Sequence, residues 1–234
     1  MRRHGADPRL GAAVRAWGVR ARYAAAAARW WEGDDGAAAR LLDLALAPAE
    51  AAYRAAVRLR NGAYARGWLP VARAGVPVVS VGNLTVGGTG KTPVARWVVA
   101  ELLRRGARPA VLHGGYAPDE PALHRCWHPG VPVLVGRDRL ASAREAVARG
   151  ADVLVLDDGF QHRRLARDVD LVLVAAERWT DRPRLLPRGP WREPPAALAR
   201  AHVVAVTRRV VPLGDAARVA ARVRAYAPEA ATAI

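Results

Sequence analysis

The segment VGNLTVGGTGKTPVARW, residues 81–97, decides the expected fold of this 234-residue chain. It contains Lys91, the only lysine among 37 basic residues, the other 36 being arginine. A glycine-rich turn that leads into Gly-Lys-Thr at the start of a helix forms a phosphate cradle, because its backbone N–H groups and the positive end of the helix dipole point at the ligand. A compact ammonium fits such a cradle better than a broad, planar guanidinium. The pattern therefore predicts a phosphate loop and a reason for the single lysine.

This loop predicts a binding site for a nucleoside triphosphate with Mg²⁺. Lys91 is expected to contact the β- and γ-phosphates and Thr92 to offer its hydroxyl to the metal. Thr85 occupies the position of the first glycine in the standard GxxxxGK[ST] pattern, so the loop is closer to the GG-x-GKT variants. Switch ATPases with that variant commonly have a second lysine where this chain has Val86. The residues expected to bind nucleotide are Thr85, Gly87, Gly88, Thr89, Gly90, Lys91 and Thr92.

Beyond residue 75, short β-branched runs alternate with helical patterns. The expected strands are 76–81, 109–113, 131–136, 152–157, 171–176 and 202–207, and the expected helices are 91–105, 137–149 and 214–226. Continuous apolar strands separated by helices are typical of a parallel sheet covered on both faces. Residues 76–234 are therefore predicted to form a P-loop NTPase-like, doubly wound α/β core with a mostly parallel sheet.

Two segments precede this core. Residues 1–36, rich in Ala, Arg and Trp, are expected to form a helical extension of unknown role. In residues 37–75 a largely apolar stripe recurs at helical spacing, and Pro48 suits the first turn of a new helix. The stripe is Leu42, Leu46, Ala49, Tyr53, Val57, Arg60 and Tyr64. This helix either packs on its own domain or lies in a membrane interface.

Composition limits the compartment and the partners. A single cysteine excludes an intramolecular disulfide and fits a reducing compartment. The formal net charge of +16 favours an anionic partner such as a nucleotide, a nucleic acid or an anionic membrane. Nucleic acid is not expected, because the arginines are spread over the chain and no DNA- or RNA-binding motif is visible. No uncharged apolar stretch is long enough to span a bilayer.

Acidic residues follow two of the expected strands. Asp157 and Asp158 end the run DVLVLDDGFQH, at the edge where open α/β sheets bind ligands, and are expected to hold Mg²⁺ and to serve a second role. His162 in the same turn is a candidate contact for nucleotide or an ordinary loop histidine. Asp119, in GYAPDEP, is a candidate to take a proton from an acceptor hydroxyl. In HRCWH, residues 124–128, a zinc site is the alternative to a loop of ordinary residues.

These motifs, in this order, resemble the tetraacyldisaccharide 4′-kinase family over roughly residues 41–207. The motifs that carry the resemblance are GNLTVGGTGKTP, DEP, VGRDR, LDDGFQHRRLARD and LLPRGPWREP. The resemblance implies a monotopic enzyme on the cytoplasmic face of the inner membrane. Such an enzyme transfers the γ-phosphoryl of MgATP to the 4′-hydroxyl of a tetraacylated glucosamine disaccharide 1-phosphate in lipid A biosynthesis.

The resemblance also implies roles for individual residues. Lys91 and Asp119 would be catalytic, as would Arg192 and Glu193 of the REP turn, and residues 41–68 would dock on the lipid surface. The metal-proximal residues would be Thr92, Asp157 and Asp158.

The chain departs from the family pattern in three ways. It has His113-Gly114-Gly115-Tyr116-Ala117 where the family has Ser-Arg-Gly-Tyr-Gly, and its loop before DEP is shorter. The family continues into a second lobe that supplies a histidine paired with the catalytic aspartate. A P-loop switch ATPase and a nucleotide-binding remnant without transfer are the alternative functions.

Overall fold

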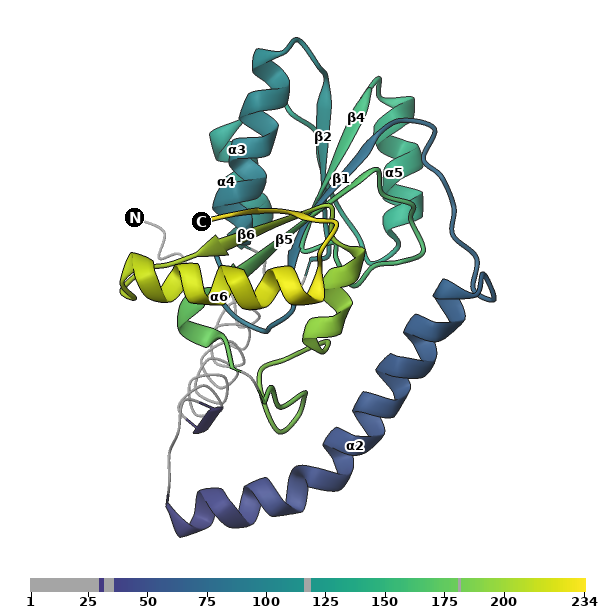
Figure 1. The fold of residues 1–234 in the computed structure, drawn as a ribbon. Coiled ribbons are helices and arrows are strands. Elements are labelled where there is room, and N and C mark those ends of the chain that lie inside the picture. The colour runs from purple at the N-terminus through teal and green to yellow at the C-terminus, as the bar shows by residue number, and fades with distance from the viewer. Residues whose placement is uncertain (1–29, 32–35, 116–118, 181) are drawn as a thin grey trace, which may run out of the picture.

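A seven-stranded parallel sheet forms the centre of the molecule (Figure 1). The computed structural model describes residues 30–31, 36–115, 119–180 and 182–234. The strand order is β3-β2-β4-β1-β5-β6-β7, and every neighbouring pair is parallel. The strands are β1 Val78–Asn83, β2 Pro109–His113, β3 Val133–Val135, β4 Val153–Asp157, β5 Val169–Ala175, β6 Val203–Thr207 and β7 Ala231–Ala233. The predicted doubly wound α/β core is confirmed, with β1 between β4 and β5.

Helices cover both faces of the sheet, and the alternating side chains of β4 show how the two faces divide. Val155 packs in a cluster with Val99 of α3, whereas Leu154 and Leu156 pack with Ala143 of α5. The helices are α2 Ala37–Ala65, α3 Lys91–Arg104, α4 Asp119–Trp127, α5 Arg139–Ala148 and α6 Leu213–Tyr226, with short 3₁₀ turns at Ala176–Arg178 and Pro195–Arg200. Helix α6 closes a third apolar cluster over β5 and β6. Because both faces are covered, the β4 side chains are fully buried, as its continuous apolar sequence predicted.

Two local expectations were wrong. Pro48 does not begin a new helix, because α2 runs through it without a break, and only the hydrogen bond to the missing N–H is lost there. The HRCWH run is neither a strand nor a loop: His124 lies inside α4 and His128 directly follows it. Cys126 is exposed while His124 is fully buried, so these side chains do not share a face and no zinc site forms.

Helix α2 reaches away from the sheet and is attached to the core by polar contacts. Glu50 is buried on the core side of α2 and accepts a 2.9 Å hydrogen bond from the backbone N–H of Leu185. The Tyr53 hydroxyl donates to the carbonyl of Arg192 at 3.0 Å. Within the predicted stripe, Val57 is buried against the core, whereas Leu42, near the start of α2, is exposed. No helix in the described part of the chain has the length and hydropathy needed to cross a membrane.

Glu193 forms the strongest of these attachments. Its carboxylate is fully buried and accepts hydrogen bonds from Arg60 at 3.1 Å, Asn61 at 2.9 Å and Arg200 at 2.9 Å. Two of these partners lie on α2, and Arg200 lies on the 3₁₀ turn that follows the REP sequence. A buried carboxylate requires such pairing, because an unpaired charge is costly inside a protein. In the structure Glu193 thus attaches α2 to the core, and the catalytic role that the resemblance implied stays a prediction.

We predict that Glu193→Ala lowers the free energy of unfolding by about 3 kcal/mol, near the low end for breaking a buried ion pair, because Arg60 stays partly solvated. Amide hydrogen exchange should also accelerate in the last two turns of α2. Chemical denaturation and exchange mass spectrometry measure the two effects. Glu145→Ala, which removes an exposed pair with Arg149, is the control and should change stability by less than about 0.5 kcal/mol. Equal stability of the two variants would contradict this account of how α2 is attached.

Candidate nucleotide and phosphoryl-transfer site

The phosphate loop joins β1 to α3, and neighbouring elements hold it on both sides. Thr89 is buried: its hydroxyl accepts a 2.8 Å hydrogen bond from the side-chain amide of Asn83, and its carbonyl accepts one from Thr207 at 3.3 Å. Thr85 is also buried and forms an antiparallel bridge with Trp191. The hydrogen bonds of Thr89 therefore stabilise the conformation of the loop, and Thr85 pairs with the neighbouring segment at Trp191.

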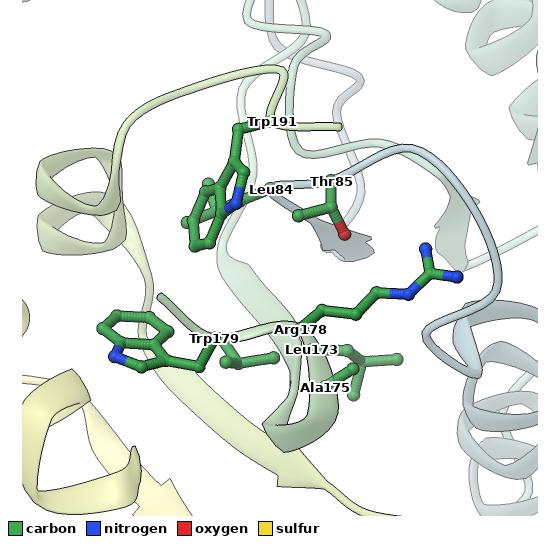
Figure 2. A pocket seen from close by; sticks show the side chains of 8 residues that line it. Leu84, Thr85, Leu173, Ala175, Arg178, Trp179 and Trp191 are labelled. Carbon is green, nitrogen blue, oxygen red and sulfur yellow. The ribbon is translucent and has the colours of Figure 1, made fainter. Parts of the chain in front are cut away.

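The first half of the loop rests on Arg178. The Arg178 guanidinium donates a 2.9 Å hydrogen bond to the carbonyl of Val86. Figure 2 shows the Arg178 side chain extending toward this loop. A small cavity of about 10 Å³ beside it is lined by Trp179 and Trp191, among other residues. Gly87 has φ +98°, and a Cβ there would lie 2.6 Å from the Arg178 guanidinium. The positive φ thus favours glycine at this position, whereas the Arg178 guanidinium, at the end of a flexible side chain, could move aside.

Lys91 begins α3 directly after Gly90 and points at Asp158, with 3.6 Å between Nζ and Oδ1. Arg192 reaches the same carboxylate, and its Nη1 lies 2.9 Å from both oxygens of Asp158. Its backbone N–H donates to the carbonyl of Leu84 at 2.7 Å, so the REP segment runs along the base of the phosphate loop. The structure thus brings together Lys91, Asp158 and Arg192, three residues that the sequence placed in the site.

Burial by itself would raise the pKa of Asp158, but the charges of Lys91 and Arg192 and their hydrogen bonds outweigh it and hold that pKa below its ordinary value. Asp158 is also the only non-glycine residue with a positive φ, +59°, in the described ranges. Such a conformation costs free energy and persists where the surroundings impose it. Strand β4 ends at Asp157, so Asp158 lies just outside the strand, and the metal-binding role expected of the two aspartates stays a prediction.

Asp157 is buried beneath this cluster. Its Oδ2 atom lies 2.9 Å from Nε2 of His124, which is itself fully buried on α4. The Oδ1 atom is buried without a hydrogen-bond partner among the described residues. Buried carboxylate oxygens normally have a partner, so this atom is suited to bind a cation or a water molecule.

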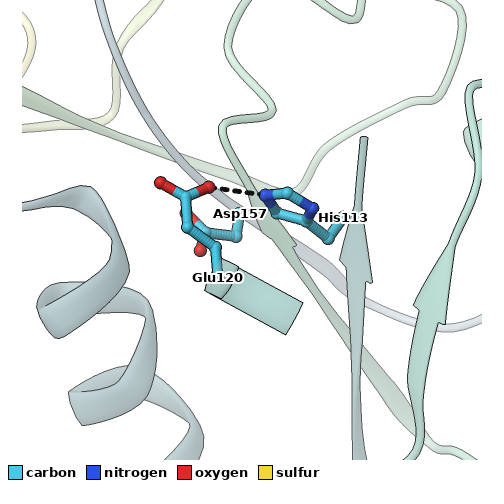
Figure 3. A group of neighbouring side chains, drawn as sticks. All are labelled: His113, Glu120 and Asp157. Carbon is cyan, nitrogen blue, oxygen red and sulfur yellow. Dashed lines mark hydrogen bonds and ion pairs between the residues drawn. The ribbon is translucent and has the colours of Figure 1, made fainter. Parts of the chain in front are cut away.

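Glu120, which was not among the predicted site residues, lies close to Asp157. Its Oε2 atom is 2.7 Å from Nε2 of His113, the last residue of β2 (Figure 3). The hydrogen bond to His113 lowers the pKa of Glu120, burial opposes this shift, and the charge of Lys91 adds to it. Asp119, the predicted proton acceptor, is the first residue of α4 and is exposed to solvent. The two neighbouring acidic residues therefore differ: Glu120 points inward, while Asp119 is accessible.

The residues present fit Mg²⁺. His113, Glu120 and Asp157 each place one polar atom within 4.8 Å of the others. Oxygen atoms are the ligands that Mg²⁺ prefers, and Asp157 offers a carboxylate oxygen that has no hydrogen-bond partner within the described ranges. Thr92 follows Lys91 in the first turn of α3, at the carboxyl end of the sheet, where the carboxylates also lie.

His162, a candidate nucleotide contact, is surrounded by arginines, and its role stays a prediction. Burial lowers the pKa of His162 to about 4, and the positive charges of Arg139, Arg167 and Arg164 add to the effect. Arg139 belongs to α5, and Arg164 and Arg167 precede β5, so these neighbours come from outside the phosphate loop.

The comparisons with known proteins agree with this geometry. A family model described as Tetraacyldisaccharide-1-P 4′-kinase matches residues 42–126 and 117–232. A tetraacyldisaccharide 4′-kinase of Anaeromyxobacter dehalogenans (strain 2CP-C) is 50% identical over 198 residues, which cover 75% of this chain and 52% of that protein. The corresponding kinase of Halorhodospira halophila is 45% identical over 203 residues, 78% of this chain and 60% of that protein.

A solved structure is similar as well. The "apo" form of LpxK from Aquifex aeolicus, in complex with ATP, superimposes with a TM-score of 0.66 at 34% identity, over 71% of this chain and 59% of that one. The chain spans about half the length of the first of these curated relatives. Because the family model covers most of the described core, the chain belongs to the tetraacyldisaccharide-1-phosphate 4′-kinase family.

Proposed function

We propose that this chain binds MgATP and contributes to transfer of the γ-phosphoryl group to the 4′-hydroxyl of a tetraacylated glucosamine disaccharide 1-phosphate. The observation that carries the proposal is the Lys91 ammonium, 3.6 Å from Asp158 at the mouth of a glycine-rich loop. Asp157 and Glu120 lie next to this pair. A phosphate loop, a cation and convergent carboxylates are the parts that phosphoryl transfer requires.

The transfer forms a bond between the acceptor 4′-oxygen and the γ-phosphorus and breaks the bond from phosphorus to the bridging oxygen, so that ADP leaves. The proton of the acceptor hydroxyl passes to a carboxylate, for which we propose Asp119 because it is accessible at the start of α4. Lys91 and Arg192 place positive charge where the phosphoryl oxygens carry negative charge. Mg²⁺, when bound through Thr92 and Asp157, would supply further neutralisation of the β- and γ-phosphates. In this proposal the backbone N–H groups of residues 85–90 bind the phosphates.

We predict that Lys91→Ala abolishes nucleotide binding and transfer, because the loop loses the charge that holds the triphosphate. Asp119→Asn should keep nucleotide affinity but reduce transfer by about 10²–10⁴-fold, the usual contribution of a general base. Transfer of labelled γ-phosphate from ATP to the lipid acceptor in detergent micelles measures activity, and calorimetry measures nucleotide binding. Asp215→Asn on α6, which removes an exposed contact with Arg218, is the matched control and should leave both unchanged.

Two outcomes of this experiment would reject the kinase proposal. ATP hydrolysis at the same rate with and without the lipid acceptor would favour a switch ATPase. Nucleotide binding by the unaltered chain without transfer to the acceptor would favour a nucleotide-binding remnant.

We further propose that α2 rests on an anionic membrane surface, which would place the enzyme peripherally on the cytoplasmic face of the inner membrane. At 3.6 residues per turn, Leu41, Leu44 and Leu59 fall on the side of α2 opposite Glu50 and Val57. These three leucines are 69%, 71% and 75% exposed. Exposed apolar side chains with arginines nearby are typical of a helix in the bilayer interface, and Arg40 and Arg58 are exposed on the same helix.

The acceptor itself would require a large site with apolar and cationic walls. The described residues surround a hollow of about 600 Å³ beside Gly87 of the phosphate loop. Its walls include the indoles of Trp30, Trp31, Trp179 and Trp191 and the guanidinium groups of Arg178, Arg182, Arg184 and Arg188. Aromatic rings and arginines suit a ligand that combines sugar rings with an anionic group, so this hollow supports the proposed acceptor class.

We predict that the double variant Leu41→Asp/Leu44→Asp loses at least about tenfold of its affinity for vesicles with anionic headgroups, because burial of one leucine contributes about 1.5–3 kcal/mol. Co-sedimentation with phosphatidylglycerol-containing vesicles measures this affinity. Leu103→Asp changes an exposed leucine of α3 and should bind as the unaltered chain does. Retention of the double variant on the vesicles, or an equal loss by Leu103→Asp, would show that α2 is not the membrane-facing surface.

A further inference from the structure

Two buried histidines lie behind the carboxylates of the candidate metal site. His113, at the end of β2, contacts Glu120 at 2.7 Å, and His124, in the second half of α4, contacts Asp157 at 2.9 Å. Both imidazoles are almost fully buried, with 2% and 0% of their surface exposed. Each carboxylate thus has one oxygen fixed by an imidazole from a different element.

The hydrogen bonds determine which nitrogen of His113 carries its hydrogen. The backbone N–H of Gly115 donates to Nδ1 of His113 at 3.0 Å, so Nδ1 holds a lone pair. The hydrogen of the neutral ring is then on Nε2, which donates it to Glu120. A ring nitrogen that donates a hydrogen cannot ligate a metal, and the other nitrogen already accepts from the backbone.

The same reasoning applies to His124. An ionised carboxylate can only accept, so Nε2 of His124 donates to Asp157, and Nδ1 is buried without a partner among the described residues. Both nitrogens of His113 are therefore engaged, although His113 lies within ligand distance of both carboxylates, and His124 is not among the residues whose ligand atoms gather there. The atoms that remain available are oxygens, in particular the unpartnered Oδ1 of Asp157.

We propose that His113 and His124 are positioning residues that hold Glu120 and Asp157 so that one oxygen of each carboxylate faces a single hard divalent cation. This inference rests on the proposed function, because the cation is the one that accompanies the nucleotide. Groups that orient metal ligands in this way typically change metal affinity by 10–100-fold when they are removed. Fixing both carboxylates in advance also lowers the entropy that the side chains lose when the cation binds.

Replacement of each histidine by glutamine and by asparagine tests the proposal. The amide of glutamine reaches about as far as Nε2 and can donate to the carboxylate, whereas the shorter asparagine amide cannot reach it. Mn²⁺ serves as the probe, and electron paramagnetic resonance of free Mn²⁺ measures its affinity in the presence of a non-hydrolysable ATP analogue. We expect His113→Asn and His124→Asn to weaken Mn²⁺ binding by about 10–100-fold and the two glutamine variants to retain most of it.

The control is His128→Asn, because the imidazole of His128 lies 3.3 Å from the carbonyl of Arg96 and is not one of the clustered residues. Circular dichroism gives the folded fraction of each variant, and Mn²⁺ affinity is referred to folded protein. If a His124 variant fails to fold, the His113 pair decides the question, since Glu120 is one-third exposed and better able to adapt. Equal Mn²⁺ affinity of the asparagine and glutamine variants at His113 would overturn the proposal.

The result also separates this inference from the proposed function. If the unaltered chain binds the nucleotide analogue with Mn²⁺ and the histidine variants do so equally well, the positioning role is wrong and the nucleotide site stands. If the unaltered chain binds neither the analogue nor Mn²⁺, the proposed function itself fails.

Discussion

The arrangement of the site depends on one charged contact, the ammonium of Lys91 against the carboxylate of Asp158. Lys91 is carried by the first turn of α3, and Asp158 directly follows the last residue of β4, so the contact links α3 to the carboxyl end of a central strand. Arg192 binds the same carboxylate, and together Lys91 and Arg192 outweigh the effect of burial on the pKa of Asp158. A lone buried carboxylate would be unfavourable here, and two cations make it stable. The same cations are in place to meet a triphosphate.

The outer parts of the molecule are linked to this contact through Arg192 and its neighbour. The backbone N–H of Arg192 bonds the start of the phosphate loop, and its carbonyl accepts from Tyr53 of α2. Glu193 adds the contacts to Arg60 and Asn61 on the same helix. A helix with an exposed apolar side is thus connected to the phosphate loop through two consecutive residues.

Much of the core could be predicted from local sequence. The apolar runs gave six of the strands to within a few residues, and the glycine-rich loop located Lys91 and Thr92, because strand periodicity and phosphate-loop chemistry both depend on short segments. Helix α2 was expected as well, but its polar attachment was not. Glu50 contacts Leu185 and Asn61 contacts Glu193, and pairs so far apart in sequence leave no local pattern.

The inward-facing half of the site shows the same limit. Glu120 adjoins Asp119, and only the start of α4 decides which of the two carboxylates points inward. His124 seemed an ordinary residue, because nothing near it in the sequence indicates that it meets Asp157 thirty-three positions later. The DEP motif indicates both acidic residues. The contact between His113 and Glu120 cannot be predicted from the sequence, because it depends on β2 and α4 lying side by side.

The most direct test is the position of the metal in a crystal of the chain grown with Mn²⁺ and a non-hydrolysable ATP analogue. Anomalous scattering locates Mn²⁺ independently of the protein atoms. The account predicts one peak next to Oδ1 of Asp157 and the hydroxyl of Thr92, with the terminal phosphate against the amine of Lys91. A triphosphate bound elsewhere, or a Mn²⁺ peak remote from both Asp157 and Lys91, would contradict it.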